Sequence, residues 1–198
     1  MISKVENFIS EEDHKFLIEY IKYLEENDKW DKSDPHPSWH GRYVHANLLA
    51  FKGMFGTDKD IECLEILIGI RNKIRDHIIN IRNLNVSLYS DTLQIVRWLP
   101  GNEQHPHADS ENPDGSPHPY PWREHASIVY LNDEFDGGVT YFPELNVDSK
   151  PTPRTLVTFP GTKEYMHGVT KVDNGRRYTI ASFWTTDPLR GILVENED

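Results

Sequence analysis

The part of the chain after Asn85 constrains the fold most, because its apolar residues come in short runs without helical spacing. The runs are rich in Val, Ile, Thr, Tyr and Phe, and clusters of Pro, Gly, Asn and Asp separate them. No helical segment alternates with them, so parallel strands joined by helices are not expected. The pattern predicts an antiparallel double-sheet jelly roll. The runs cover residues 86–99, 125–131, 138–142, 154–159 and 177–184.

Residues 1–85 carry helical patterns instead. Ser10, followed by three acidic residues, predicts a capped helix start. Two apolar stripes have helical spacing, and the second is interrupted by Gly69, which weakens a helix. We predict two helices that support a sheet, joined over residues 31–56 by an irregular connection that folds over the site entrance. The stripes are Phe16, Leu17, Tyr20, Ile21 and Leu24, and then Ile61, Leu64, Ile68, Ile74, Ile78 and Ile81.

Length and composition predict one α+β domain over residues 1–198. Residues 1–85 would be mainly helical support, and residues 86–187 the jelly-roll core. A chain of 198 residues is long enough to bury about two-thirds of the surface that its unfolded form exposes. The net charge of −11 argues against a nucleic-acid partner, because phosphates require a surface rich in Lys and Arg.

The cysteine and hydropathy patterns bear on the cellular setting. Cys63 is the only cysteine, which excludes an intrachain disulfide, and we expect it to be a small buried apolar residue. The first residues show no basic segment followed by an apolar one, and no apolar run of about eighteen residues occurs. We therefore expect a soluble protein of the reducing cytoplasm with no membrane partner.

The most informative polar residues are His107, Asp109 and His167, with Arg177 ten positions after His167. In an extended segment, residues two apart project to the same side, so His107 and Asp109 can converge on one ion while Ala108 points away. Two imidazoles and one carboxylate form the facial triad of non-heme Fe(II) oxygenases, which leaves coordination positions open for a co-substrate and O2. The guanidinium of Arg177 offers bidentate recognition of a carboxylate on that co-substrate.

These residues also have simpler interpretations. A chain with ten His and 32 acidic residues contains a His-X-Asp sequence by chance fairly often, and such a pair is common in surface loops. His105 extends the segment to HPHAD, which invites comparison with two other metal motifs. The motif HxHxDH fails because Ser110 stands at its last position. The cupin pattern GxxxxxHxHxxxE fails on the spacing of its glycine, although Glu111 is correctly placed, and remains a minor alternative. We interpret His36, His40, His45, His118 and His125 as loop or surface residues.

Seven sequence blocks follow one another through the β-rich part of the chain. They are LQIVRWL (93–99), HAD (107–109), SIVYLND (127–133), GGVTYFPE (137–144), RTLVTF (154–159), HGV (167–169) and GRRY (175–178). In this order and at these distances they resemble the catalytic domain of 2-oxoglutarate/Fe(II)-dependent dioxygenases of the prolyl 4-hydroxylase type. The resemblance covers roughly residues 90–187, and its most specific part is the HxD…H pair with GGxTxFP between. Residues 1–85 resemble no family.

The resemblance implies a jelly-roll enzyme that uses Fe(II), 2-oxoglutarate and O2, with ascorbate as a further reductant. His107, Asp109 and His167 would be the metal ligands. The oxidative decarboxylation of 2-oxoglutarate to succinate and CO2 would drive the hydroxylation of a substrate. The protein's part would be the geometry of the ligands, the anchoring of the co-substrate and the exclusion of water.

The resemblance also implies the residues that bind the co-substrate. Related enzymes place a basic residue nine or ten positions after the distal His, so Arg176 competes with Arg177. The tyrosine that follows Arg177 resembles the Arg-Tyr pair of some members and favours Arg177. Tyr130 stands where a tyrosine hydroxyl contacts the same carboxylate, and Thr140 is expected to line the pocket. The alternatives are a half-buried strand aromatic for Tyr130 and a structural strand threonine for Thr140. For the glycine pair 137–138 we expect a turn or a close approach of the backbone.

For the substrate, the resemblance implies a prolyl residue in a peptide or protein. Aromatic residues near the expected cavity mouth could stack on a Pro-rich chain, and the loop 110–124 is either a lid or a rigid surface loop. Alternatives are a free amino acid or another small molecule, and a non-catalytic jelly-roll binding module. Trp98 and Gln104 stand where many prolyl hydroxylases carry tyrosines, which puts the polar contacts of that strand and the substrate class in doubt. The aromatic residues are Trp39, Trp98, Tyr120 and Trp122.

Overall fold

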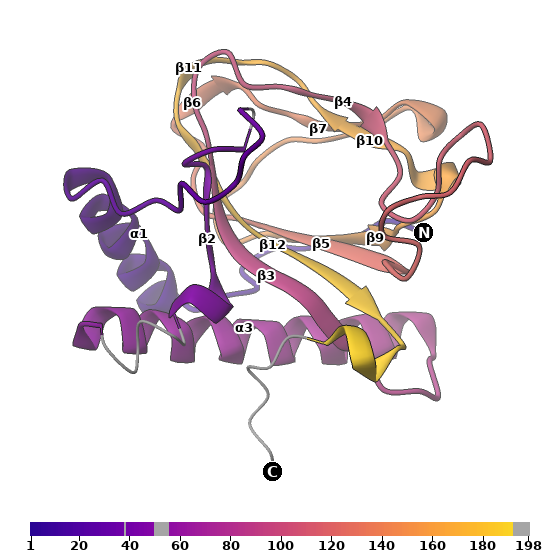
Figure 1. The fold of residues 1–198 in the computed structure, drawn as a ribbon, viewed down its shortest axis with the longest axis horizontal. Helices are drawn as coiled ribbons and strands as arrows, with labels where there is room; N and C mark the ends of the chain where they lie inside the picture. Colours follow the sequence, from indigo (N-terminus) through magenta and orange to yellow (C-terminus); the bar gives the residue numbers. More distant parts are fainter. Residues whose placement is uncertain (38, 50–55, 192–198) are drawn as a thin grey trace.

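The computed structural model describes residues 1–37, 39–49 and 56–191, and it consists of two facing β-sheets with helices on one outer side (Figure 1). The six-stranded sheet contains, in spatial order, β1 (Ser3–Val5), β9 (Leu156–Pro160), β5 (His125–Tyr130), β12 (Arg177–Thr185), β3 (Tyr89–Trp98) and β2 (Tyr43–His45). The four-stranded sheet contains β4 (Gln104–His107), β10 (His167–Val169), β7 (Thr140–Phe142) and β8 (Val147–Ser149). A smaller pair consists of β11 (Val172–Gly175) and β6 (Phe135–Gly137). The pairings are antiparallel, and the prediction of an α+β jelly roll, or double-stranded β-helix, is confirmed.

Both predicted helices are present. Helix α1 (Glu11–Glu26) begins at Ser10, whose side chain accepts a hydrogen bond from the Asp13 N–H at 3.0 Å. Helix α3 (Asp58–Arg82) runs through Gly69 without a break and begins with a capping box between Thr57 and Asp60. Among the helices of the described residues, none has the length and hydropathy that a membrane span requires. The described residues also include the short 3-10 helices η1 (Pro143–Leu145), η2 (Lys163–Tyr165) and η3 (Pro188–Arg190).

The main apolar core lies between the helices and the outer face of the six-stranded sheet. Leu17, Tyr20, Ile21 and Leu24 of α1 are buried there as predicted. The stripe predicted for α3 is wrong at both ends, because Ile61 and Ile81 are exposed. The helix is rotated relative to that prediction, so a different set of side chains packs against α1 and the sheet. Its buried face consists of Asp60, Cys63, Leu67, Ile70, Arg71, Ile74 and Ile78.

The connection predicted over residues 31–56 is not wholly irregular. Its central part forms β2, an edge strand in which Tyr43 pairs with Val96 and His45 with Gln94. Residues 38 and 50–55 lie outside the described residues. The connection does reach the cavity described below, because Trp39 lies in the cavity wall. The segment therefore contributes to the cavity wall, and its folding over the entrance stays a prediction.

Strand register determines which side chains face the space between the sheets. In the pairing of β12 with β3, Arg177 lies opposite Trp98, Thr179 opposite Val96 and Ala181 opposite Gln94. Since side chains alternate along a strand, every second residue of β12 and β3 faces the four-stranded sheet. The inner face of the large sheet thus becomes the floor of a cavity whose roof is the four-stranded sheet.

Candidate metal and co-substrate site

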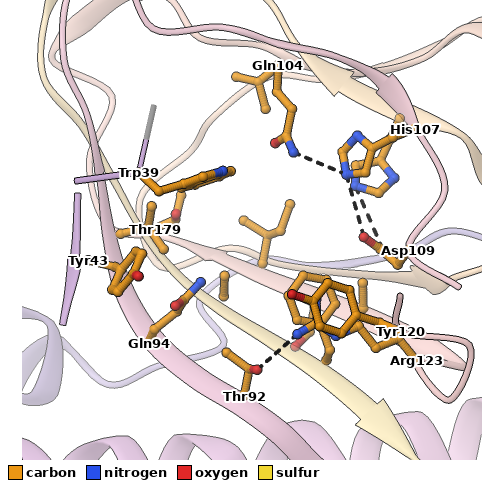
Figure 2. A pocket seen from close by; sticks show the side chains of 18 of the residues that line it. Trp39, Tyr43, Thr92, Gln94, Gln104, His107, Asp109, Tyr120, Arg123 and Thr179 are labelled. Carbon is orange, nitrogen blue, oxygen red and sulfur yellow. Dashed lines mark hydrogen bonds and ion pairs between the residues drawn. The ribbon is translucent and has the colours of Figure 1, made fainter. Parts of the chain in front are cut away.

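A cavity of ≈ 470 Å³ lies between the two sheets. Its roof includes His107 of β4 and His167 of β10. Its floor includes Gln94 and Thr179, and Arg123 lies beside them (Figure 2). Trp39 and Tyr43 stand at the end remote from His107, as Figure 2 shows. The cavity therefore has one end rich in metal-ligating groups and another rich in aromatic and amide groups.

The predicted metal ligands converge at the first end. His107 is the last residue of β4, His167 is the first residue of β10, and the two face each other across the strand pair. Asp109 follows two residues after β4, where its backbone N–H donates to the Gly161 carbonyl at 2.9 Å. The ligand atoms of the three side chains all lie within 4.8 Å of one another. This arrangement can hold one metal ion.

Hydrogen bonds fix the orientation of both imidazoles. The Nδ1 atom of His107 lies 3.1 Å from the His105 carbonyl, and that of His167 lies 3.2 Å from the Tyr165 carbonyl. A carbonyl oxygen only accepts, so each Nδ1 carries the proton and each Nε2 presents a lone pair. The amide of Gln104 donates to the same Nε2 of His107 at 3.3 Å. A carbonyl partner on Nδ1 is the usual support of a metal-ligating histidine.

Asp109 is buried and its Oδ2 atom has no hydrogen-bond partner within the described residues. The His107 Nε2 lies 3.6 Å from Oδ1 and the His167 Nε2 lies 3.9 Å from Oδ2. Burial lowers the pKa of both imidazoles, but the closer Asp109 carboxylate raises that of His107 overall, while that of His167 stays lowered. A buried carboxylate oxygen without a partner is costly, and a cation bound by all three side chains would satisfy it.

Arg177 lies in the same cavity and is almost wholly buried, at 1 % exposure. Its Nη2 donates to the Thr140 hydroxyl at 3.1 Å, and its Nε has no hydrogen-bond partner in the part of the chain that the structure describes. Within the described residues, no carboxylate lies at ion-pair distance from it, and burial lowers its pKa. Because a buried cation without an anion is strongly unfavourable, the site is suited to an anionic ligand.

Tyr130 and Thr140 stand behind Arg177 and do not line the cavity. The Tyr130 hydroxyl donates to Thr140 Oγ1 at 2.9 Å, and Thr140 in turn accepts from Arg177. Gly138 adopts a positive φ of 61°, and a Cβ there would lie 3.0 Å from the Arg177 Cδ. The prediction of a close backbone approach at the glycine pair 137–138 is confirmed. These residues hold the arginine in place from behind.

Arg176, the alternative anchor, points elsewhere. Its side chain is 51 % exposed and pairs with Glu25 of α1 at 3.0 Å. Side chains alternate along a strand, so only one of two consecutive arginines can face the cavity. In this structure that residue is Arg177.

Sequence reasoning missed part of the lining at the aromatic end. His45 and Gln94 form a cross-strand pair on the cavity floor, and His118 also lines it. The histidines at 45 and 118 therefore do not behave as ordinary surface residues. Trp122, expected at the mouth, does not line the cavity, because its Nε1 donates to Asp91 at 2.9 Å. A period-2 pattern through residues 43–45 could have indicated β2, but the partner of a strand cannot be read from one segment.

The end of the loop 110–124 is fixed to the floor. Arg123 pairs with Asp91 at 2.8 Å, and its guanidinium stacks between the rings of Tyr120 and Phe183 at 4.0 and 3.9 Å. Asp91 accepts from both Trp122 and Arg123. The last residues of this loop are therefore fixed in place, which favours a rigid surface loop over a lid for them.

A double-stranded β-helix with a His-X-Asp…His cluster on its smaller sheet defines the class of metal-dependent jelly-roll oxygenases. Residues 93–185 match the family model described as the 2OG-Fe(II) oxygenase superfamily. The match covers the jelly-roll part of the chain, which is therefore similar to this superfamily. Its members use Fe(II), 2-oxoglutarate and O2. The site fits these groups, because the triad offers three ligands to one ion and Arg177 lacks an anion.

Individual proteins show the same relationship. The chain is 28% identical to mouse prolyl 3-hydroxylase 2 over 180 residues, which covers 80% of this chain and 26% of that protein. It is 38% identical to chicken prolyl 3-hydroxylase 1 over 77 residues, or 36% of this chain and 11% of that protein. The chain thus spans about a quarter or less of the length of these curated relatives.

Solved structures with the same fold include prolyl hydroxylases. The viral collagen prolyl hydroxylase of Paramecium Bursaria Chlorella virus-1, solved as a 2OG complex, has a TM-score of 0.66 at 20% identity, covering 94% of this chain and 96% of that one. A Trichoplax adhaerens prolyl hydroxylase, solved with a peptide fragment of the hypoxia inducible factor oxygen degradation domain, has a TM-score of 0.68 at 15% identity, covering 98% and 87%. These similarities concern the fold.

Proposed function

We propose that this protein is an Fe(II)- and 2-oxoglutarate-dependent hydroxylase that acts on a prolyl residue of a peptide or protein. One observation carries the proposal: a single cavity contains both the three-ligand cluster and a buried arginine without an anionic partner. A binding module without catalysis has no need of both. The names of the sequence relatives and of the solved structures support the choice of substrate.

In this proposal each group of the cavity has its own task. His107, Asp109 and His167 hold the iron, and Arg177 binds the distal carboxylate of 2-oxoglutarate, with Tyr130 and Thr140 holding the arginine in place. When bound, the iron, 2-oxoglutarate and O2 would supply the oxidising chemistry: one oxygen atom of O2 enters the C–H bond of the substrate to give C–OH, and the other enters succinate as 2-oxoglutarate loses CO2.

The protein also keeps water away from the reacting end of the cavity. The rings of Phe142 and Phe159 lie 5.8 and 4.5 Å from the His167 ring and are both buried. In a site with few waters, the charge-assisted contact of Arg177 to a carboxylate is stronger than in solution. The apolar side of the metal site therefore protects the co-substrate and strengthens its anchoring.

The remote end of the cavity suits a peptide. Trp39 and Tyr43 provide aromatic surfaces against which proline rings of a polyproline-type chain can stack. His45 and Gln94 also line the cavity, and within the described residues their side chains make no hydrogen bonds, so these side chains can bond to peptide groups. The net charge of −11 favours a neutral or basic substrate over a nucleic acid.

The experiment is a succinate assay with Fe(II), 2-oxoglutarate and a panel of proline-containing peptides, followed by mass spectrometry. We expect succinate formation that rises with one class of peptide, and a gain of one oxygen on a proline. Because the sequence relatives are prolyl 3-hydroxylases, whereas the sequence resembles prolyl 4-hydroxylases, amino-acid analysis should separate 3- from 4-hydroxyproline. Turnover of a free amino acid without oxidation of any peptide would contradict the prolyl assignment, and no succinate under any condition would contradict the enzyme itself.

A further inference from the structure

The backbone around Arg177 lacks a regular strand partner on one side. In the pairing of β5 with β12, Tyr130 is the last residue of β5 and lies opposite Thr179. Residues 176–178 thus extend past the end of β5. On the other side, β3 continues, and Trp98 pairs with Arg177. The segment that carries the proposed co-substrate anchor is therefore held by regular pairing from β3 alone.

Leu131 supplies only half of the missing pairing. Its N–H donates to the Tyr178 carbonyl at 3.0 Å, as in a continued strand. Its carbonyl, however, accepts from the His14 Nε2 at 2.6 Å, so it is directed toward α1. The Tyr178 N–H therefore needs a different acceptor.

The side chain of Asn132 fills this position. Its Oδ1 accepts from the Tyr178 N–H at 2.8 Å, and its Nδ2 donates to the Arg176 carbonyl at 2.8 Å. One carboxamide thus bonds to the residue before Arg177 and to the residue after it. It has the donor and acceptor of a peptide group and takes the place that the next residue of β5 would have occupied.

The outward side chains of the same segment are fixed by Glu25. This carboxylate accepts from Arg97 at 2.8 Å, Arg176 at 3.0 Å and Tyr178 at 3.0 Å. Side chain bonds to Glu25 hold the strand toward α1, but they leave the backbone of residues 176–178 without lateral support. Among the described residues, only the Asn132 amide and the Leu131 N–H supply that support on the side away from β3.

We infer that Asn132 is a positioning residue for Arg177, and that it sets the affinity for the distal carboxylate of 2-oxoglutarate. The inference rests on the proposed role of Arg177. A long side chain reaches a ligand accurately only when its backbone is fixed, because a small rotation at the backbone is amplified at the guanidinium. Asn132 itself does not line the cavity and touches neither the co-substrate position nor the metal ligands.

The test compares two 2-oxo acids that differ in the distal carboxylate. Binding of 2-oxoglutarate and of 2-oxobutyrate to the Mn(II)-loaded full chain is measured by calorimetry. For Asn132→Ala we expect about tenfold weaker 2-oxoglutarate binding, with 2-oxobutyrate binding changed less than about twofold. Asn132→Asp keeps the acceptor for Tyr178 and loses the donor to Arg176, so we expect an effect between those of wild type and Asn132→Ala.

Two controls separate the possible failures. Asp133→Ala truncates the neighbouring exposed side chain and should leave both affinities unchanged. Equal loss of both 2-oxo acids in Asn132→Ala and Asn132→Asp would show a merely structural role, and unchanged selectivity in both would also overturn the inference. If Arg177→Ala lowers the selectivity for 2-oxoglutarate and the Asn132 variants do not, only the positioning inference fails. If Arg177→Ala leaves the selectivity unchanged, the proposed anchor fails and the inference fails with it.

Discussion

The two sheets of the jelly roll contribute to the cavity in different ways. The large sheet has long strands, with 10 residues in β3 and 9 in β12, and its outer face packs on both helices. The small sheet has 4 residues in β4 and 3 in β10, with a register irregularity between His167 and Val169. The small sheet nevertheless carries both histidines of the metal cluster.

The large sheet therefore contributes mainly to stability, and the small sheet carries the metal-ligating histidines. Long paired strands with a buried outer face resist local opening, so the centre of the floor belongs to the most stable part of the molecule. The small sheet depends on close packing at a few points. A Cβ on Gly168, for example, would lie 2.6 Å from the Gln104 carbonyl, so the strands around His167 approach closely because this residue has no side chain. Substitutions in the small sheet are therefore expected to affect metal binding and activity most. Substitutions in the helix-backed sheet are expected to affect the free energy of unfolding most.

The largest expected effect is at the metal cluster of the small sheet. Replacing His107, Asp109 or His167 with Ala removes one donor from a three-ligand site, and we expect iron-dependent succinate formation to fall to background. Metal content after dialysis and succinate production provide the measurement. His105→Ala alters an exposed histidine on the same strand and should keep full activity. Full Fe(II)-dependent activity in all three variants would refute the cluster as the metal site.

The second effect concerns Arg177 on the large sheet. Loss of a charge-assisted bidentate pair in a dry pocket costs about 2 to 4 kcal/mol, so Arg177→Ala should raise the 2-oxoglutarate requirement about 30- to 1000-fold. Metal binding should change little, since the arginine is not a ligand. The measurement is the 2-oxoglutarate dependence of succinate formation. Arg176→Ala is the matched control, and the opposite pattern, a large effect at Arg176 and none at Arg177, would contradict the register described here.

The third prediction tests the rotation of α3 against the large sheet. Leu67 is fully buried and Ile81 is 43% exposed. Leu67→Ala should lower the free energy of unfolding by about 2 to 5 kcal/mol, whereas Ile81→Ala should change it by less than about 0.5 kcal/mol. Urea denaturation provides the measurement. Similar losses in the two variants would support the apolar stripe that the sequence predicts rather than the observed one.

The smallest effect is a pH dependence at the start of β5. Burial, with a contribution from Arg82, lowers the pKa of His125 to about 4, and its Nδ1 has no partner within the described residues. In the unfolded chain this pKa is about 6.5, so between about pH 6.5 and pH 4 the unfolded state binds more protons and the free energy of unfolding falls as pH falls. His125→Gln should reduce this fall by about 2 kcal/mol. Stability curves at several pH values test it, with His40→Gln as the exposed control. An unchanged pH dependence in His125→Gln would contradict the assignment.

Much of the site could be predicted from sequence because its elements are local. The spacing of His107 and Asp109 requires only an extended backbone, and Ser10 marks a helix start through its own side chain. Alternation along β12 explains why Arg177, and not Arg176, faces the cavity. His167 was predicted as the third metal ligand from the family resemblance, because no local pattern connects it with His107 and Asp109.

Other features depend on contacts between distant segments. The pairing of His45 with Gln94, and the bonds of Asn132 around Arg177, follow from where β2 lies and where β5 ends, which no single segment reveals. The buried face of α3 depends on its contacts with α1 and the sheet, so apolar periodicity alone placed Ile61 and Ile81 wrongly in the core. These features arise from tertiary contacts that override local patterns.

The most direct test of the account is an anaerobic titration of the Fe(II)-loaded protein with 2-oxoglutarate, followed by visible absorbance. Chelation of Fe(II) by a 2-oxo acid produces a charge-transfer band. We expect the band in the wild type and no band in Asp109→Ala. In Arg177→Ala we expect the band only at much higher 2-oxoglutarate concentration. Absence of the band in the wild type, or identical titrations of all three proteins, would contradict the claim that one cavity binds Fe(II) through the triad and 2-oxoglutarate through Arg177.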